Sequence, residues 1–309
     1  MSDAAIDVRG ISKSFQRGSV VLDDVTFTLR RGEIVALIGA SGSGKSTLIR
    51  SLAGLLAVDR PTREAGDVSG RIDMLGHPIQ IRGRVNCSRD LRSRIGVIFQ
   101  QFNLVPRLSV LTNVCLGLLG RIPTWQGALG AFGDAEKSKA MQALSRVGIA
   151  EHALKRASEL SGGQQQRAAI ARTLVQGAEV LIADEPIASL DPASARRVMD
   201  LIADMNRRDG LTVFISLHQV EYALRYCPRT IALKGGKIVY DGPSDALTPE
   251  FLNQIYGAES EELFLSPFQS HVPAPIKNGN GGKTTNWKKH PAARGRAKVT
   301  ATRAERLNA

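Results

Sequence analysis

A glycine-rich loop between an apolar strand and a helical segment limits the possible folds of this chain more than any other feature. The loop spans residues 39–47 and reads G-A-S-G-S-G-K-S-T, directly after the apolar run 34–38 and before a helical start at 48–52. Glycines allow backbone N–H groups to turn inward around a polyphosphate, and the positive end of the following helix dipole adds to the attraction. A Gly/Ser-rich turn that binds nothing is the alternative. The strand before the loop and the helix after it favour a phosphate-binding loop in an α/β domain.

The side chains of this loop have separate predicted tasks. Lys45 is expected to reach the β- and γ-phosphates of a nucleotide, and the Ser46 hydroxyl is expected to ligate Mg²⁺. The loop residues predicted to bind nucleotide are Gly39, Ala40, Ser41, Gly42, Ser43, Gly44, Lys45, Ser46 and Thr47.

A second anion site is predicted where residues 161–164, S-G-G-Q, precede a run of helix-forming residues. A Ser at a helix N-cap with glycines beside it offers unpaired N–H groups, a hydroxyl and the positive end of the helix dipole. By itself such a sequence is more often only a helix cap. Together with the phosphate loop it favours a second contact to the nucleotide, made by Ser161, Gly162, Gly163 and Gln164.

Two adjacent acids end the predicted buried strand that begins at Glu179 and continues through the apolar residues 180–183. Asp184 is placed to hold Mg²⁺, directly or through water, beside Ser46. Glu185 points to the other side and is the candidate that polarises the attacking water. A solvated turn is the alternative, but an unused pair of acids after a buried strand is costly.

With these motifs the chain resembles the ATP-binding cassette family, and Leu160 to Gln164 matches the signature sequence of that family. The matches extend from about residue 6 to about residue 257. The resemblance implies ATP hydrolysis to ADP and phosphate with Mg²⁺. It also implies a head-to-tail homodimer, in which the signature of one subunit closes over the γ-phosphate held by the phosphate loop of its partner.

The resemblance also assigns roles to residues outside the first loop. Asp184 takes the Mg²⁺-supporting position, Glu185 the catalytic position, and His218 the position of the switch histidine that contacts the γ-phosphate and orients water. Asp191 lies in the segment that crosses the dimer interface in this family. Without the resemblance, a His at a strand end is more often a surface residue.

Two further assignments depend on the register of the resemblance. Gln100 follows an aromatic residue, and in the family that glutamine contacts both Mg²⁺ and the attacking water; Gln101 is adjacent and chemically equivalent. The strand before these residues is expected to end at Gln100. Phe15 stands where the family stacks an adenine ring, and it has the aromatic face without a hydroxyl. A core or strand-end role is the alternative for Phe15.

The predicted fold is α/β, with a P-loop NTPase (RecA-like) core, an antiparallel β subdomain and an inserted α-helical subdomain. Short alternating strands are expected between Ile6 and Leu29, and an amphipathic helix is expected near 135–147. The nucleotide-binding domain is predicted to span 1–257, with the helical insertion at about 103–163. In importers and exporters of the family, this insertion receives a helix of the membrane subunit.

Residues 258–309 are predicted to form a basic, disordered tail. Between residues 263 and 309 there are nine Lys and Arg and one Glu, in a chain whose net charge is +12. Few large apolar residues are present there to offset the ordering entropy. Attraction to an anionic membrane surface and a solvated extension without function are both open, and direct nucleic-acid binding is not expected because Trp287 is the only aromatic residue among the basic ones.

Composition narrows the class of protein further. No apolar run approaches the length of about 18 residues that a membrane helix needs, and residues 1–7 do not read as a secretory signal. The three cysteines, Cys87, Cys115 and Cys227, have neither metal-ligand nor redox spacing, as in reduced cytosolic proteins. These features agree with a peripheral protein on the cytoplasmic face of a bacterial inner membrane.

The stretches 99–110, 184–192, 216–227 and 233–242 resemble, within the cassette family, the ATP-binding subunits of phosphonate importers. That resemblance implies a translocase driven by ATP, with transmembrane permease subunits as partners and a periplasmic substrate-binding protein acting indirectly. Import of phosphate or phosphite would use the same ATPase chemistry and stays open. A soluble cassette protein acting on nucleic acid or ribosomes is the alternative from another class, but the short spacing between the motifs and the single cassette disfavour it.

Overall fold

The structure is a computed structural model that describes residues 3–16, 18–60, 69–123, 127 and 130–257. All of them belong to the first of two compact units, Met1–Pro267. The predicted basic tail, 258–309, lies outside the described residues.

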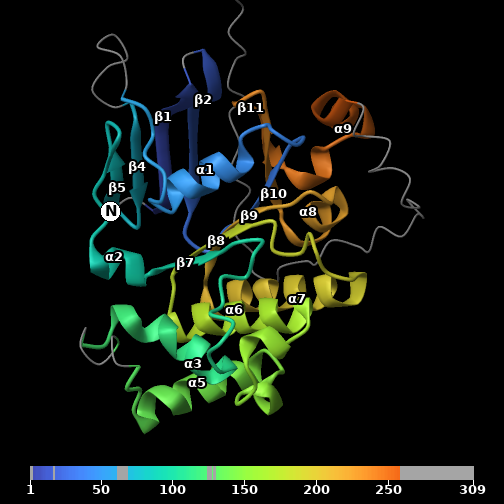
Figure 1. The fold of residues 1–309 in the computed structure, drawn as a ribbon. Helices are drawn as coiled ribbons and strands as arrows, with labels where there is room; N and C mark the ends of the chain where they lie inside the picture. The colour runs from blue at the N-terminus through green and yellow to red at the C-terminus, as the bar shows by residue number, and fades with distance from the viewer. Residues whose placement is uncertain (1–2, 17, 61–68, 124–126, 128–129, 258–309) are drawn as a thin grey trace, which may run out of the picture. The chain divides into compact units, whose positions relative to one another are not determined.

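A six-stranded sheet forms the centre of this unit (Figure 1). Its order is β11-β10-β3-β9-β8-β7, and all neighbouring pairs are parallel except β10 with β11. The strands are β3 (Ile34–Ile38), β7 (Ile95–Ile98), β8 (Val180–Asp184), β9 (Thr212–Ser216), β10 (Arg229–Lys234) and β11 (Lys237–Pro243). In a parallel sheet the carboxyl ends of the strands meet at one edge, where ligands of α/β proteins bind. The predicted α/β core is therefore confirmed.

A second sheet is entirely antiparallel, with the order β2-β1-β4-β5-β6. It consists of β1 (Ala4–Gln16), β2 (Ser19–Arg30), β4 (Arg71–Met74), β5 (His77–Ile81) and β6 (Arg84–Val85). The expectation of short strands in this region is wrong, because β1 has 13 residues and β2 has 12. Register shifts interrupt their pairing, and the positive φ angles of Gly10 (54°) and Asp24 (51°) break the alternation that a long strand would show in sequence.

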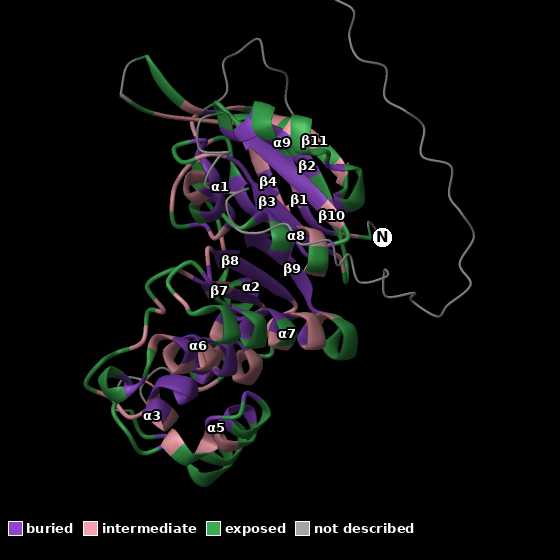
Figure 2. Cartoon of the chain, turned by 90° about the vertical axis from the view of Figure 1, so that its right-hand side faces the viewer, coloured by how far each residue is buried: buried purple, intermediate pink, exposed green. Residues whose placement is uncertain are grey.

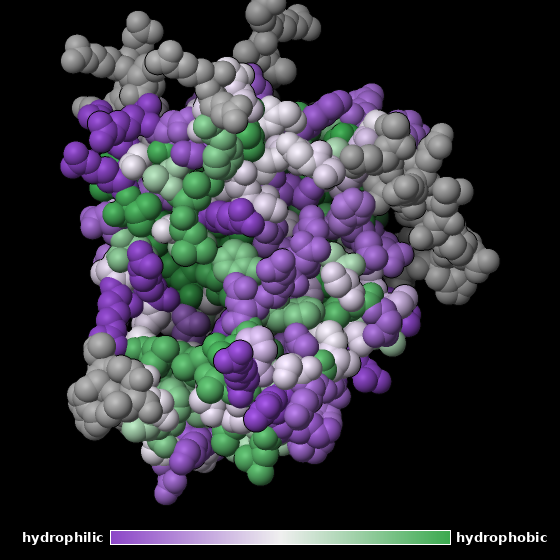
Figure 3. All heavy atoms as spheres, viewed as in Figure 1, coloured by the Kyte–Doolittle hydropathy of each residue, from purple (hydrophilic) through white to green (hydrophobic). Residues whose placement is uncertain are grey.

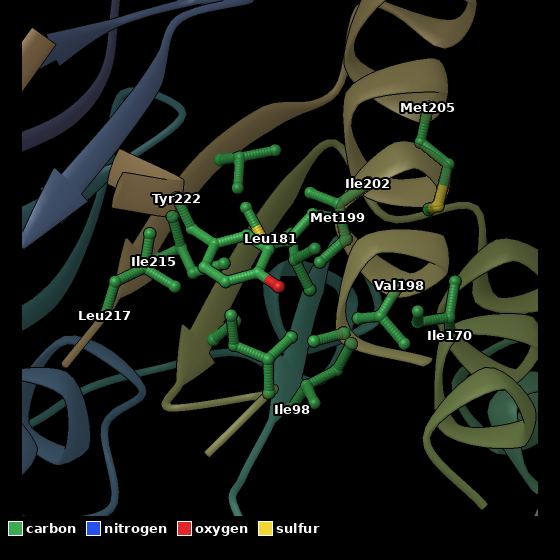
Figure 4. Packing of buried hydrophobic residues seen from close by; sticks show 14 of the residues in the cluster. Ile98, Ile170, Leu181, Val198, Met199, Ile202, Met205, Ile215, Leu217 and Tyr222 are labelled. Atoms are coloured by element: carbon green, nitrogen blue, oxygen red, sulfur yellow. The ribbon is translucent and has the colours of Figure 1, made fainter. Parts of the chain in front are cut away.

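Alternate residues of the parallel strands face two separate cores. On one face, the apolar side chains pack with helix α1 (Lys45–Leu52) and the antiparallel sheet, and they include Val35, Leu37, Val180, Ile182 and Phe214. On the other face, they pack with helices α6 (Gly162–Gln176) and α7 (Pro192–Asp209), and they include Ala36, Ile38, Leu181, Ala183 and Ile215. Figure 2 shows the buried strands between layers with exposed outer surfaces. Figure 4 shows Met199 and Ile202 of α7 on the side of Leu181, and Val198 of α7 beside Ile170 of α6.

Most of the chain between β7 and β8 is helical. It contains α3 (Val110–Cys115), the 3₁₀ helix η1 (Leu116–Gly120), α5 (Asp134–Arg146), and the 3₁₀ helices η2 (Ala150–His152) and η3 (Ala157–Glu159), followed by α6. The helix expected near 135–147 is confirmed as α5. Helices α3, α5 and α6 pack on one another, so this region has its own apolar contacts.

Two strands end earlier than expected. Strand β7, preceded by helix α2 (Arg89–Ser93), ends at Ile98 instead of Gln100, because its only partner in the sheet, β8, pairs with it no further than Ala183. Strand β9 ends at Ser216, two residues before His218. Both ends lie where the chain leaves the sheet for the loops that carry the predicted site residues.

The last described elements return to the central sheet. They are α8 (Val220–Tyr226), the 3₁₀ helix η4 (Ser244–Ala246) and α9 (Pro249–Tyr256), which packs against β10. Within the described residues, no helix combines the length and the apolar character that crossing a membrane requires.

Candidate nucleotide-binding site

The loop after β3 can form only with glycine at defined positions. Gly39 has φ 151°, and a Cβ atom there would lie 2.2 Å from the carbonyl oxygen of Leu233. Gly44 has φ 106°, and a Cβ atom there would lie 2.7 Å from the carbonyl oxygen of Val21. At these two positions the loop backbone approaches β10 and β2 too closely for a side chain, and α1 begins directly afterwards at Lys45. The backbone N–H groups of the loop and of the first turn of α1 can therefore face an anion.

Polar side chains of the loop fit a phosphate ligand. Lys45 is buried, and its Nζ donates to the carbonyl oxygens of Gly39 at 2.6 Å and Ala40 at 3.1 Å. The hydroxyl of Ser43 is buried without a hydrogen-bond partner in the part of the chain that the structure describes. A buried polar atom without a partner costs free energy, which a ligand oxygen or water would recover.

Distant parts of the chain support the loop. The hydroxyl of Tyr256 at the end of α9 accepts the N–H of Gly39 at 3.2 Å, and Gly236 donates its N–H to the carbonyl oxygen of Ser43 at 3.1 Å. Neither Tyr256 nor Gly236 belongs to the predicted site. Their sequence neighbourhoods carry no signal for it, because each reaches the loop only through the folded sheet.

The two predicted acids lie at the end of β8, and a serine of β9 connects them. Asp184 is buried, and its Oδ1 accepts the Ser46 hydroxyl at 3.2 Å and the Ser216 hydroxyl at 2.9 Å. The Ser216 hydroxyl in turn accepts the backbone N–H of Glu185 at 2.9 Å. The structure thus brings Ser46 and Asp184 together, as predicted. Ser216 was missed, although a polar residue at the end of an otherwise apolar strand was the available signal.

Glu185 and His218 share one cavity. Glu185 has φ 47°, an uncommon backbone conformation for a residue with a side chain, and such conformations are often found at functional sites. Glu185 and His218 line a cavity of about 260 Å³ together with Ile187, Ala188, Leu217 and Gln219. The structure therefore places the two residues that were predicted to be catalytic on one cavity.

Gln100 and Gln101 lie in a second cavity, of about 530 Å³. Its other lining residues are Phe102, Asn103, Leu104, Gln165 and Ser189. Both glutamines are exposed, so the structure keeps each of them accessible. The loop that contains them is tied to α6 because Arg172 donates to the carbonyl oxygen of Asn103 at 2.7 Å.

The predicted second anion site is the N-terminus of α6. Ser161 is its N-cap residue, and its Oγ accepts the N–H of Gln164 while the Gln164 side chain accepts the N–H of Ser161, which is a capping box. Gly162 and Gly163 form the first turn. A Cβ atom at Gly163 would lie 2.7 Å from the Ser194 hydroxyl oxygen, so glycine permits the close contact with α7.

The two remaining residues predicted to bind nucleotide, Asp191 and Phe15, lie at different elements, α7 and β1. Asp191 is the N-cap of α7, where it accepts the N–H groups of Ala193 and Ser194, each at 3.0 Å. Hydrogen bonding from Ser194 lowers the pKa of its carboxyl group. Phe15 is the penultimate residue of β1 and is 59% exposed, so the alternative core role is wrong, whereas the alternative strand-end position agrees with the structure. The Lys13 Nζ lies 5.6 Å from the centroid of its ring.

One copy of the chain holds two groups of predicted nucleotide contacts on opposite faces of the central sheet. The phosphate loop continues into α1 on one face, and the 161–164 cap opens α6 on the other (Figure 1). The cap lies beside Leu190, whose Cδ2 would be 3.5 Å from a Cβ atom at Gly162. Asp184 contacts Ser46 of the phosphate loop, whereas the cap begins the helix on the other face of the sheet.

Comparison with protein families and curated proteins gives consistent matches. The family described as ABC transporter matches residues 22–188. The phosphonates import ATP-binding protein PhnC of Stutzerimonas stutzeri is 57% identical over 282 residues, covering 90% of this chain and 100% of that protein. PhnC 2 of Pseudomonas syringae pv. syringae, with the same description, is 58% identical over 262 residues, covering 84% of this chain and 92% of that protein.

Solved structures show the same fold. The cbiO1 protein of Clostridium perfringens, described as part of the ABC transporter complex cbiONQ, superimposes with a TM-score of 0.64 at 30% identity, covering 79% of this chain and 90% of that one. A dimeric ATP-binding cassette in a post-hydrolysis state, bound to ADP and Pi, has a TM-score of 0.65 at 29% identity, covering 78% of this chain and 100% of that one.

Proposed function

Because this chain belongs to the ATP-binding cassette (ABC) transporter family, whose ATP-binding subunits hydrolyse ATP, we propose that it is the ATPase subunit of a phosphonate importer. The observation that carries the mechanism is the placement of the phosphate loop and the 161–164 cap on opposite faces of one sheet. Each ATP site is then completed only when a second copy supplies its cap. The substrate class rests on the 57% identity to a phosphonates import protein over its full length.

The residues present fit a nucleoside triphosphate with a divalent cation. The loop 39–47 would hold the phosphates, with Lys45 and the unpaired Ser43 hydroxyl as polar contacts. Ser46 and Asp184, whose oxygens are already 3.2 Å apart, would hold Mg²⁺ together with Gln100. Such a cation neutralises phosphate charge when bound. Phe15 offers its exposed ring to the adenine.

The protein side of the hydrolysis is performed by residues of the 260 Å³ cavity. Glu185 accepts a proton from a water molecule as its oxygen bonds to the γ-phosphorus, and His218 orients that water. The bond from the γ-phosphorus to the bridging oxygen breaks, which releases ADP and phosphate. Ser216 holds the backbone of Glu185 in position for this task.

The homodimer couples this chemistry to movement. With ATP between the loop of one copy and Ser161, Gly162, Gly163 and Gln164 of the other, the two copies are held together, and loss of the γ-phosphate releases them. Asp191 and its neighbours lie next to the cap and cross the interface. A ligand must favour the closed state by about 5.5 kcal/mol to move a two-state equilibrium from 1:99 to 99:1.

The helices between β7 and β8 transmit the movement to transmembrane permease subunits. Figure 3 shows hydrophobic residues gathered on the face toward the viewer, between the antiparallel sheet and helices α3 and α5. The 530 Å³ cavity around Gln100 and Gln101 opens at the junction with α6. We assign this face to the membrane partner, which places the chain peripherally on the cytoplasmic side of the inner membrane, with a periplasmic binding protein delivering the substrate to the other side.

A genetic experiment tests the substrate class. Deletion of the gene is expected to abolish growth on methylphosphonate as the sole phosphorus source and to leave growth on phosphate intact. The wild-type gene should restore growth and the Glu185→Gln gene should not. Unimpaired growth on methylphosphonate in the deletion strain, with loss of growth on phosphite, would reassign the importer to phosphite.

A further inference from the structure

A histidine lies directly behind the 161–164 cap. His152 belongs to η2, its side chain is 18% exposed, and its Nε2 lies 2.8 Å from Nε2 of Gln164. Gln164 is the cap residue whose side chain also bonds Ser161. His152 thus contacts the residue that closes the capping box.

The hydrogen bonds of Gln164 assign the tautomer of His152 that can pair with it. The N–H of Ser161 can only donate, so the side-chain atom of Gln164 that it reaches at 2.9 Å is the carbonyl oxygen. The amide nitrogen of Gln164 therefore faces His152, and it too can only donate. Nε2 of His152 must accept, which requires a neutral imidazole with its proton on Nδ1. That Nδ1 is buried without a hydrogen-bond partner among the described residues.

We propose that His152 is a positioning residue for the nucleotide-binding cap: the neutral imidazole holds Gln164 in the capping box, and protonation of Nε2 releases it. This inference rests on the proposed function, in which the cap binds the ATP held by the partner copy. With the amide of Gln164 released, the N–H of Ser161 loses its partner and the first turn of α6 loses its fixed geometry.

An acidic neighbour can form an ion pair with the protonated imidazole of His152. Oε1 of Glu151, on the same turn, lies 3.4 Å from Nε2 of His152 and would accept a hydrogen bond from the protonated ring. Arg167 of α6 is the cation on the neighbouring helix; its guanidinium donates to the carbonyl oxygens of Val147 and Gly148 and interacts with Glu151. On α5, which packs against η2, Arg146 is engaged by Asp204 and Asp209. Nε2 therefore has two alternative partners, Gln164 when it is neutral and Glu151 when it is charged.

The test uses the full-length protein with Glu185→Gln, so that ATP binding and dimer formation are measured without turnover. The ATP concentration for half-maximal dimerisation is measured at about pH 8 and about pH 6, on either side of the ordinary imidazole pKa. The parent is expected to need severalfold more ATP at the lower pH, because a protonated Nε2 can no longer accept the amide N–H of Gln164. Each variant is compared with this parental shift.

Four variants separate the contributions of His152 and Glu151 to the pH dependence of ATP-driven dimerisation. His152→Gln presents a neutral acceptor at similar reach, so it should match the parent at pH 8 and lose most of the shift. His152→Leu removes the acceptor and should need severalfold more ATP at both pH values. Glu151→Gln removes the partner of the protonated imidazole and should reduce the shift. His77→Gln, at the exposed first residue of β5, is the matched control and should behave like the parent. Any shift that persists in His152→Gln belongs to other groups such as His218.

The outcomes distinguish this inference from the function on which it rests. If His152→Leu and His152→Gln both show the parental affinity and the parental pH shift, His152 does not position the cap. If the parent itself forms no dimer with ATP at either pH, the proposed composite site is wrong. Circular dichroism of each variant identifies loss of folding, and His152→Gln then carries the test if His152→Leu is unfolded.

Discussion

Ser216 shows how much of the site depends on a residue without a recognisable motif. Its hydroxyl connects the cation-binding and catalytic acids, donating to Asp184 and accepting from the backbone of Glu185. Asp184, Glu185 and Ser46 were predictable because each belongs to a contiguous motif. Ser216 lies opposite Asp184 only because β8 and β9 pair in a particular register, which no local pattern of the chain encodes.

Replacing Ser216 tests this connection. Ser216→Ala leaves the buried N–H of Glu185 without a partner, and it should lower the free energy of unfolding by about 1–3 kcal/mol. It should also lower ATPase activity, because the backbone of Glu185 is no longer held. Ser51→Ala is the control, since Ser51 is equally buried but bonds the carbonyl oxygen of Thr47 within its own helix. Urea unfolding and ATPase assays report both effects; equal ATPase activity in the two variants would contradict the role given to Ser216.

At the scale of elements, Glu179 joins the two sheets through ion pairs. Just before β8, it is bonded to Arg94, which precedes β7, at 2.5 Å, and to Arg31, which follows β2, at 3.1 Å. The hydrogen bond from Arg94 is the main cause that lowers the pKa of Glu179 below its ordinary value of 4.5. The charged form is therefore the one that stabilises the fold.

The lowered pKa predicts a pH dependence of stability. A carboxyl group with a lowered pKa in the folded state stabilises above its unfolded pKa, and this contribution is lost as the pH falls through the folded value. Glu179→Gln should be less stable than wild type near neutral pH by at most about 1 kcal/mol, because the side chain is partly exposed. The difference should shrink as the pH falls below the ordinary carboxyl pKa and vanish below the lowered pKa of the folded state. Thermal unfolding of both proteins over this range measures it, and a difference that is constant with pH would exclude the ion pairs as its source.

The α9 helix supports the phosphate loop from the other end of the sequence. Tyr256→Phe removes the oxygen that accepts the N–H of Gly39 and should cost about 1 kcal/mol of stability. It should also weaken ATP binding by roughly two- to fivefold, because the loop N–H loses its support. Tyr226→Phe makes the same chemical change at a hydroxyl that donates to Asp200, and should leave ATP binding unchanged. Equal nucleotide affinity in Tyr256→Phe and wild type, by titration calorimetry, would contradict a supporting role for α9.

For the whole molecule, the sequence allowed the α/β class, the phosphate loop, the two acids and the Ser161 cap to be predicted, because each depends on neighbouring residues. Contacts between distant segments could not be predicted from the sequence. They are the hydrogen bond of Tyr256 with Gly39, the contact of His152 with Gln164, and the long β1–β2 pairing with its register shifts. The resemblance assigned roles to Gln100 and His218. The structure adds that His218 lines a cavity with Glu185, and that Gln100 lines another with Gln165 and Ser189.

The central claim is that each ATP is held by the loop of one copy and the cap of another. Two variants, both made with Glu185→Gln to stop turnover, test it by complementation. Lys45→Met disables the loop. Gly162→Asp places a negative charge at the start of α6, which suits the helix dipole and meets only ordinary contacts with Leu190 and Phe102, but repels a phosphate.

Neither variant alone should form a dimer with ATP, whereas an equimolar mixture should. In the mixed dimer, the intact loop of the Gly162→Asp copy meets the intact cap of the Lys45→Met copy, and one complete site results. Size-exclusion chromatography with labelled ATP measures the dimer and the nucleotide that it retains. A dimer that holds ATP in the mixture alone is the predicted result. A mixture as inactive as its components would contradict the account, because every site would then be built within a single copy.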